Sequence, residues 1–140
     1  MSEADKPKII AVEEHFIDPE IARLQNLDHP AFIGDRLIDF TSIRLREMDE
    51  AGIDIQVISH GAPGTHRFDA ELAVRLARGA NDLLHEAITV NPKRFAGLAA
   101  LPMQDPKAAA DELERTVTRL GFKGGIILGL TNNRFVDDKA

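Results

Sequence analysis

A carboxylate and an imidazole stand two residues apart near the amino terminus, directly after an apolar run. Segment 8–16 reads KIIAVEEHF, and its β-branched first half predicts a strand. Because side chains alternate along a strand, we expect Glu13 and His15 on one face, together with Ile9 and Ala11. Polar groups at the end of a buried strand are costly unless they are compensated, and a divalent metal ion would compensate them. The pattern therefore indicates either a metal site on Glu13 and His15 or a strand end that meets water.

Two further histidines bracket a loop that follows the second predicted strand. Residues 60–66 read HGAPGTH, and two glycines with one proline exclude regular structure. His60 and His66 are candidate catalytic residues, because a histidine there is suited to contact a substrate carboxylate or to act as an acid. Arg67 is a candidate ion-pair partner for a carboxylate. The alternative is a solvated loop without a chemical role.

The elements that must position these groups follow from apolar spacing and from helix start and stop signals. We expect strands at 8–16, 53–59, 95–101 and 123–128. Helices are expected from Asp18 to about Leu24, from a cap at Thr41 or Ser42 to Gly52, from Asp69 to Asn91, and from Asp105 to Gly121. The last of these helices is expected to bury a stripe of four apolar residues, Ala109, Leu113, Val117 and Leu120. Residues 25–40 are predicted to form a long loop, and residues 129–140 a polar tail without a helix.

Four alternations of strand and helix argue for an α/β fold with a parallel sheet covered by helices. Two architectures compete, an open doubly wound sheet and part of a (β/α)₈ barrel. The turn after the first strand, EEHFIDP at 13–19, lacks the glycine-rich loop of a dinucleotide site. In both architectures the carboxyl ends of the strands are the expected place for function.

Composition narrows the function classes. The chain has 140 residues, a formal charge of -6 and no cysteine. The acidic balance argues against a nucleic-acid partner, and no apolar run approaches the ~20 residues that span a bilayer. We expect a disordered tail over residues 1–7, one domain over 8–140, and a cytoplasmic location, which the lack of cysteine fits.

Several motifs, taken together, resemble the metal-dependent decarboxylases of the amidohydrolase superfamily, whose members include γ-resorcylate and 2,3-dihydroxybenzoate decarboxylases. The opening AVEEHF at 11–16 carries the likeness first. It continues through RLREMDEAGI at 44–53, APG at 62–64, AND at 80–82, PKRF at 92–95, AALPMQDP at 99–106 and LGFKG at 120–124. These motifs are specific for the family and uninformative about the substrate.

The resemblance implies a (β/α)₈ barrel of which this chain is the amino-terminal half, with about the first four β/α units. It implies that Glu13 and His15 ligate a divalent metal, Zn²⁺ or Mn²⁺, and that a histidine and an aspartate beyond Ala140 complete the site. It also places Ala62 and Pro63, beside Arg67, in substrate binding. The implied reaction is decarboxylation of a hydroxylated aromatic or related unsaturated carboxylic acid, a small-molecule partner.

Two alternatives stay open beside the decarboxylase. The first is a hydrolase on the same scaffold, in which the metal activates water. The second is a catalytically incomplete fragment that self-associates. A sheet cut after its fourth strand would leave an edge open and expose Ile126 and Leu128, so we expect a homo-oligomer that covers this edge.

Overall fold

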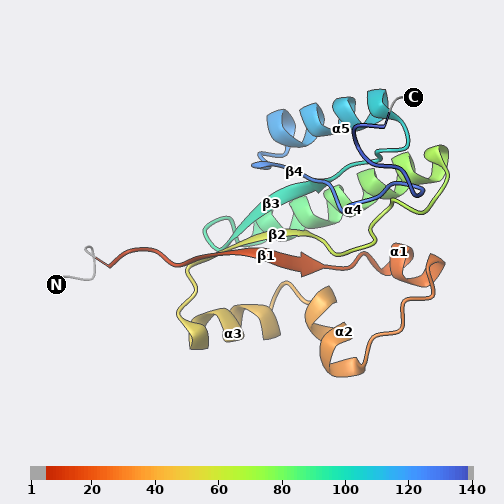
Figure 1. The fold of residues 1–140 in the computed structure, drawn as a ribbon. Coiled ribbons are helices and arrows are strands. Elements are labelled where there is room, and N and C mark those ends of the chain that lie inside the picture. Colours follow the sequence, from red (N-terminus) through yellow and green to blue (C-terminus); the bar gives the residue numbers. More distant parts are fainter. Residues whose placement is uncertain (1–5, 139–140) are drawn as a thin grey trace.

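The computed structural model describes residues 6–138 and shows four parallel strands in sequence order (Figure 1). The expected tail over 1–7 falls mainly on residues 1–5, which lie outside the described residues. The strands are β1 (Ile10–Phe16), β2 (Ile55–His60), β3 (Phe95–Ala100) and β4 (Gly124–Ile126). The helices are α1 (Pro19–Leu24), α2 (Ala31–Ile38), α3 (Ile43–Ala51), α4 (Ala70–Val90) and α5 (Pro106–Arg119).

Three of the helices begin at the caps that the sequence predicts. The Asp18 carboxylate accepts from the backbone N–H of Glu20 and Ile21, and Asp69 and Asp105 accept in the same way at α4 and α5. Such caps satisfy backbone donors that have no partner inside the helix. The predicted helix starts at these three aspartates are confirmed.

The third helix begins differently. Ser42 occupies the cap position, but its hydroxyl donates to the Asp39 carboxylate and makes no capping hydrogen bond to the helix. Asp39 replaces it, because its carboxylate accepts from the backbone N–H of Arg44 at 2.9 Å and of Ser42 at 3.3 Å. The predicted cap position is therefore confirmed at Ser42, although the capping carboxylate comes from Asp39, and Gly52 ends α3 in the left-handed conformation as expected.

The predicted loop over residues 25–40 is also wrong in part, because α2 occupies 31–38. Its apolar side chains have no core to cover, and none of its residues is buried. Phe32 and Ile38 are more than half exposed. Without a buried stripe, and with Gly34 inside the segment, the sequence carried a weak helix signal.

One face of the sheet forms the core against α4 and α5. Ile58, Phe95 and Ala99 point to this face and are at most 3% exposed. Asn81 of α4 joins the layers, since its amide donates to the Ala100 carbonyl at 3.0 Å and accepts from the Ala100 N–H at 2.8 Å. The predicted stripe of α5 is wrong at Val117, which is 42% exposed, because Glu112 and Thr116 take buried positions.

The opposite face of the sheet is open. Ile10 and Val12 of β1 are 54% and 63% exposed, and β1 and β4 are the two sheet edges. The expected exposure of Ile126 and Leu128 is only half met, because both are half-buried, while Ile127 between them is 47% exposed. Among residues 6–138, no helix has the length and apolarity that crossing a membrane requires.

A bulge in β1 breaks the simple alternation along this strand. Ala11 lies opposite Gln56, but Glu14 lies opposite Ile58, so β1 contains one extra residue. Glu13 lies in the bulge, with a φ of +66°. A bulge reverses the face of every later side chain relative to the earlier ones. The predicted shared face of Ala11 and His15 is therefore wrong.

Candidate active site

His15 faces the open side of the sheet at the carboxyl end of β1. It lies opposite Ser59 of β2, and its Nδ1 is 3.1 Å from the Ser59 hydroxyl. Its neighbour Phe16 points into the core and is 1% exposed. Ser59 is itself buried, so the ring is held by a fixed partner while Nε2 makes no hydrogen bond within residues 6–138. This arrangement suits a histidine that binds through Nε2, because ligating histidines commonly hydrogen-bond through the other nitrogen.

Glu13 lies two residues before His15, in the bulge. Its side chain is exposed and, within the described part of the chain, makes no hydrogen bond or ion pair. Glu13 and His15 line the same hollow, and a carboxylate with an imidazole is a donor combination that divalent cations accept. Glu14 belongs to the helix side of the sheet, where its carboxylate accepts from Gln56 at 3.3 Å.

His60 ends β2 on the helix side. It is 1% exposed, and its ring forms a T-shaped pair with the Phe16 ring at a centroid distance of 5.1 Å. Its Nε2 accepts from the backbone N–H of Asp18 at 3.0 Å, and its Nδ1 lies 2.8 Å from the Gly61 carbonyl, which assigns the proton to Nδ1. Burial lowers the pKa of His60, against the opposing effect of the Gly61 hydrogen bond. In this conformation His60 is neutral, with both nitrogens engaged.

His66 lies in the loop that follows β2 and is 3% exposed. Neither of its ring nitrogens has a hydrogen-bond partner among the described residues, and burial lowers its pKa. The neighbouring Arg67 and Ala62 are exposed, and Pro63 is half-buried after a cis peptide bond. The structure thus places Arg67 where a ligand can reach it and encloses His66.

The loop is anchored by side chains that sequence reasoning passed over. Gln25 donates to the Gly64 carbonyl at 2.8 Å, and Gln104 donates to the carbonyls of Thr65 at 2.6 Å and Phe68 at 3.0 Å. Amides that bind backbone at sequence separations above 35 residues have no local signature. Ser59 entered the sequence analysis only as the last residue of the strand expected over 53–59, because its partnership with His15 depends on the strand register.

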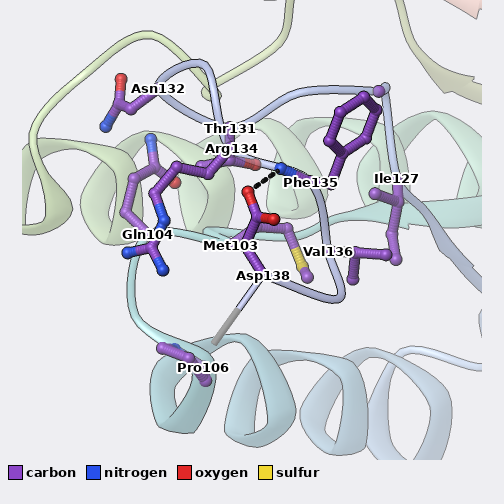
Figure 2. A pocket seen from close by; sticks show the side chains of 11 residues that line it. Met103, Gln104, Pro106, Ile127, Thr131, Asn132, Arg134, Phe135, Val136 and Asp138 are labelled. Atoms are coloured by element: carbon purple, nitrogen blue, oxygen red, sulfur yellow. Dashed lines mark hydrogen bonds between the residues drawn. The ribbon is translucent and has the colours of Figure 1, made fainter. Parts of the chain in front are cut away.

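A hollow of about 460 Å³ lies between the segment that follows β4 and the start of α5 (Figure 2). Gln104 and Asn132 line it, together with Arg134 and Phe135, and the Asp138 carboxylate accepts from the Phe135 N–H at 2.8 Å. None of the predicted site residues lines this hollow. Residues 6–138 also contain no group of three or more side chains able to hold a metal ion. Glu13 and His15 have the donor types that suit a divalent ion, and two such residues do not make a complete site.

Comparison with known proteins places this arrangement in a family. The model of the amidohydrolase family matches residues 10–139. The γ-resorcylate decarboxylase of Rhodococcus jostii is 43% identical over 133 residues, which cover 91% of this chain and 40% of that protein.

Solved structures agree with the sequence match. A dihydroxybenzoic acid decarboxylase from Polaromonas sp. JS666, with bound manganese and the inhibitor 2-nitroresorcinol, superposes with a TM-score of 0.82 at 42% identity, over 89% of this chain and 39% of that chain. A 2,6-dihydroxybenzoate decarboxylase in complex with 2,6-dihydroxybenzoate gives a TM-score of 0.82 at 39% identity, over 89% and 40%.

The chain spans about 40% of the length of the relatives it matches. The predicted fold is confirmed: four parallel strands with the helices that connect them, part of the (β/α)₈ barrel of these relatives. The chain belongs to the amidohydrolase family.

Proposed function

We propose that this chain supplies the first two metal ligands of a decarboxylase that acts on a hydroxylated aromatic carboxylic acid. The observation that carries the proposal is the pair at the end of β1: Ser59 binds Nδ1 of His15 and leaves Nε2 without a hydrogen bond among residues 6–138, and Glu13 lines the same hollow as His15. The likeness to γ-resorcylate and 2,6-dihydroxybenzoate decarboxylases supports the substrate class.

Manganese is bound in the structure of the Polaromonas relative, and zinc remains within the proposal because carboxylate and imidazole ligands suit both. The remaining ligands would come from outside residues 6–138. When bound, such an ion supplies Lewis acidity toward a substrate carboxylate and a neighbouring hydroxyl.

The reaction itself is a proton-for-carboxylate exchange. A proton is delivered to the ring carbon that bears the carboxylate, the electrons of the carbon–carboxylate bond return to the ring, and carbon dioxide leaves. The proposal assigns Arg67 to the substrate carboxylate, because its guanidinium is exposed in the loop after β2. Ala62 and Pro63, in the same loop, would form an apolar wall for the ring.

His60 and His66 remain predicted catalytic residues. Against a direct role for His60 stands its geometry, because both nitrogens are bound to backbone groups. His66 is enclosed, and its lowered pKa keeps it neutral near pH 7, which makes it a scarce proton donor. We therefore propose that His60 acts by holding the loop, and that His66 is the one of the two that remains a candidate for the acid.

The proposal includes self-association. Its support is the exposed apolar surface of β1 and α2, formed by Ile9, Ile10, Val12, Phe32 and Ile38. Sedimentation analysis over a range of protein concentrations tests it, and a monomer at all concentrations would contradict it. A cytoplasmic location stays a prediction.

The decisive experiment uses the complete protein that contains this chain, loaded with Mn²⁺ or Zn²⁺ in separate samples. We expect carbon dioxide and resorcinol from 2,6-dihydroxybenzoate, and no turnover of 4-hydroxybenzoate, which lacks the hydroxyl beside the carboxylate. Metal-free protein is the control. Turnover that is equal with and without metal would contradict the proposal, and water-dependent cleavage of esters or lactones without decarboxylation would favour the hydrolase alternative.

A further inference from the structure

The bulge in β1 decides which of three consecutive polar side chains faces the open side of the sheet. Ala11 pairs with Gln56 and Glu14 pairs with Ile58, so the extra residue precedes Glu14. Were β1 regular here, Glu14 would take the face that His15 now has, and His15 would point toward the helices. The bulge also keeps Glu13 at a φ of +66°, a conformation that is unfavourable for a side chain of this size. Something must hold this backbone in place.

Three side chains on the helix side meet the bulge, and we name them the β1 clamp: Arg44 of α3, Gln56 of β2 and Glu14 of β1. The Arg44 guanidinium donates through Nη2 to the His15 carbonyl at 2.8 Å and through Nη1 to the Gln56 side-chain oxygen at 3.1 Å. Gln56 in turn donates to the Glu14 carboxylate at 3.3 Å. The clamp thus binds the backbone of one predicted ligand and the side chain between the two ligands.

Arg44 is buried and held in place by several hydrogen bonds. It is 8% exposed, and it also donates to the carbonyls of Asp39 and Arg36, each at 2.9 Å, where α2 ends. Burial lowers the pKa of the Arg44 guanidinium, while Glu14, Asp39 and Glu47 favour its charged form. A planar guanidinium serves four acceptors in fixed directions, whereas a lysine ammonium has three donors and no fork geometry. The site therefore requires arginine and not merely a positive charge.

We propose that Arg44 is a positioning residue for the metal-ligand pair: with Gln56 and Glu14 it fixes the β1 bulge, so that Glu13 and His15 keep the spacing at which they bind one ion. This inference rests on the proposed metal site, and it concerns a residue that touches neither metal nor substrate. The clamp acts on the backbone position of the ligand pair. Its loss should therefore strongly lower the affinity for the metal, while the rest of the fold keeps most of its stability.

The chain offers a matched control in Arg94, which binds backbone at the opposite end of the sheet. Arg94 donates to the carbonyls of Asp54 at 3.1 Å and Ile53 at 3.0 Å, and it pairs with Asp49 at 2.7 Å. Both arginines therefore tie backbone carbonyls at a strand end. Only Arg44 contacts the bulged strand.

The test compares Arg44→Lys with Arg94→Lys in the complete protein, by Mn²⁺ titration of metal-free samples. We expect the Mn²⁺ Kd to rise about 10- to 100-fold in Arg44→Lys, the range typical for loss of an outer-shell partner, and to change less than about 3-fold in Arg94→Lys. Both variants should unfold at lower urea concentration than the parent. Equal Mn²⁺ affinity of parent and Arg44→Lys, or equal weakening in both variants, would overturn the inference.

A second measurement needs no metal. We expect backbone amides of residues 14–16 to exchange hydrogen faster in metal-free Arg44→Lys than in the parent, and those of 14–16 in Arg94→Lys to keep parental rates. Gln56→Ala, which leaves Arg44 in place, replaces Arg44→Lys if that variant does not fold. If the parent binds no Mn²⁺, the proposed function fails, and the exchange rates alone decide on the clamp. Unchanged exchange at 14–16 would overturn it.

Discussion

His15 and His60 lie near the ends of neighbouring strands, one step apart in the strand register. They differ in the face of the sheet to which they point, in burial and in hydrogen bonding. His15 lies opposite Ser59 on the open face, with a single side-chain hydrogen bond. His60 lies opposite Phe16 on the core face, is 1% exposed and engages both nitrogens. One step along a strand thus separates a histidine suited to bind an ion from one suited to hold a loop.

The largest expected effect comes from removing His15 or its predicted co-ligand Glu13. Glu13→Ala or His15→Ala in the complete protein should abolish stoichiometric metal binding and lower turnover by more than about 100-fold, because losing a ligand exceeds the effect of losing an outer-shell partner. Metal analysis of purified variants with turnover assays measures both. His29→Ala, at an exposed loop histidine, is the control. Full metal occupancy with parental turnover would show that these residues are not ligands.

The next largest effect concerns stability and comes from removing His60. His60→Ala should lower the free energy of unfolding by about 3 kcal/mol, because it leaves the Asp18 N–H unpaired, removes one of the two hydrogen bonds to the Gly61 carbonyl and opens a cavity beside Phe16. His15→Ala in metal-free protein should cost only about 1 kcal/mol, since it removes one hydrogen bond at a half-buried site. Urea unfolding of the two variants gives the difference. Equal losses would remove the distinction between the two histidines.

A smaller effect sharpens the role of Ser59. Ser59→Ala should raise the Kd for Mn²⁺ about 10-fold, or about 1.4 kcal/mol, because the His15 ring loses the partner that orients it. Ser42→Ala, at an exposed serine of the α3 start, should leave the affinity unchanged. Mn²⁺ titration of metal-free protein measures both. An unaltered Kd in Ser59→Ala would mean that packing alone sets the ring orientation.

The smallest effect is on pH dependence and concerns the two buried histidines. The folded state lowers the pKa of His60 and His66 below the ordinary value of 6.5, so the unfolded chain binds more protons as the pH falls below that value. Stability should therefore decrease below about pH 6.5, by up to about 1.4 kcal/mol per pH unit for each histidine, until the folded-state pKa is reached. Urea unfolding between about pH 8 and pH 5 measures this slope.

His66→Leu separates the contribution of one of these histidines. Since neither nitrogen of His66 has a partner within the described residues, the apolar replacement removes the protonation cost without removing a hydrogen bond. We expect a shallower slope below pH 6.5 than in the parent, and no such change in His29→Leu. A parental slope in His66→Leu would show that His66 does not contribute.

Local signals sufficed for much of the fold. The caps at Asp18, Asp69 and Asp105 and the left-handed stop at Gly52 depend on the residue and its nearest neighbours, and each lies where it was predicted. α2 was missed because its apolar residues cover no core, so the periodic signal that marks buried helices was weak.

The candidate site shows the same division. The sequence by itself determined that Glu13 and His15 end a strand and that His60 and His66 flank a turn-rich loop, because residue type and spacing along one segment express those features. Only the tertiary structure decided which groups face one another. The bulge at Glu13 sets the face to which His15 points, and the strand register places Ser59 beside His15. The Asp18 N–H donates to Nε2 of His60 and so engages that nitrogen. These choices depend on pairing with groups 29 to 44 residues away along the chain, where the free energy of packing and hydrogen bonding overrides local alternation.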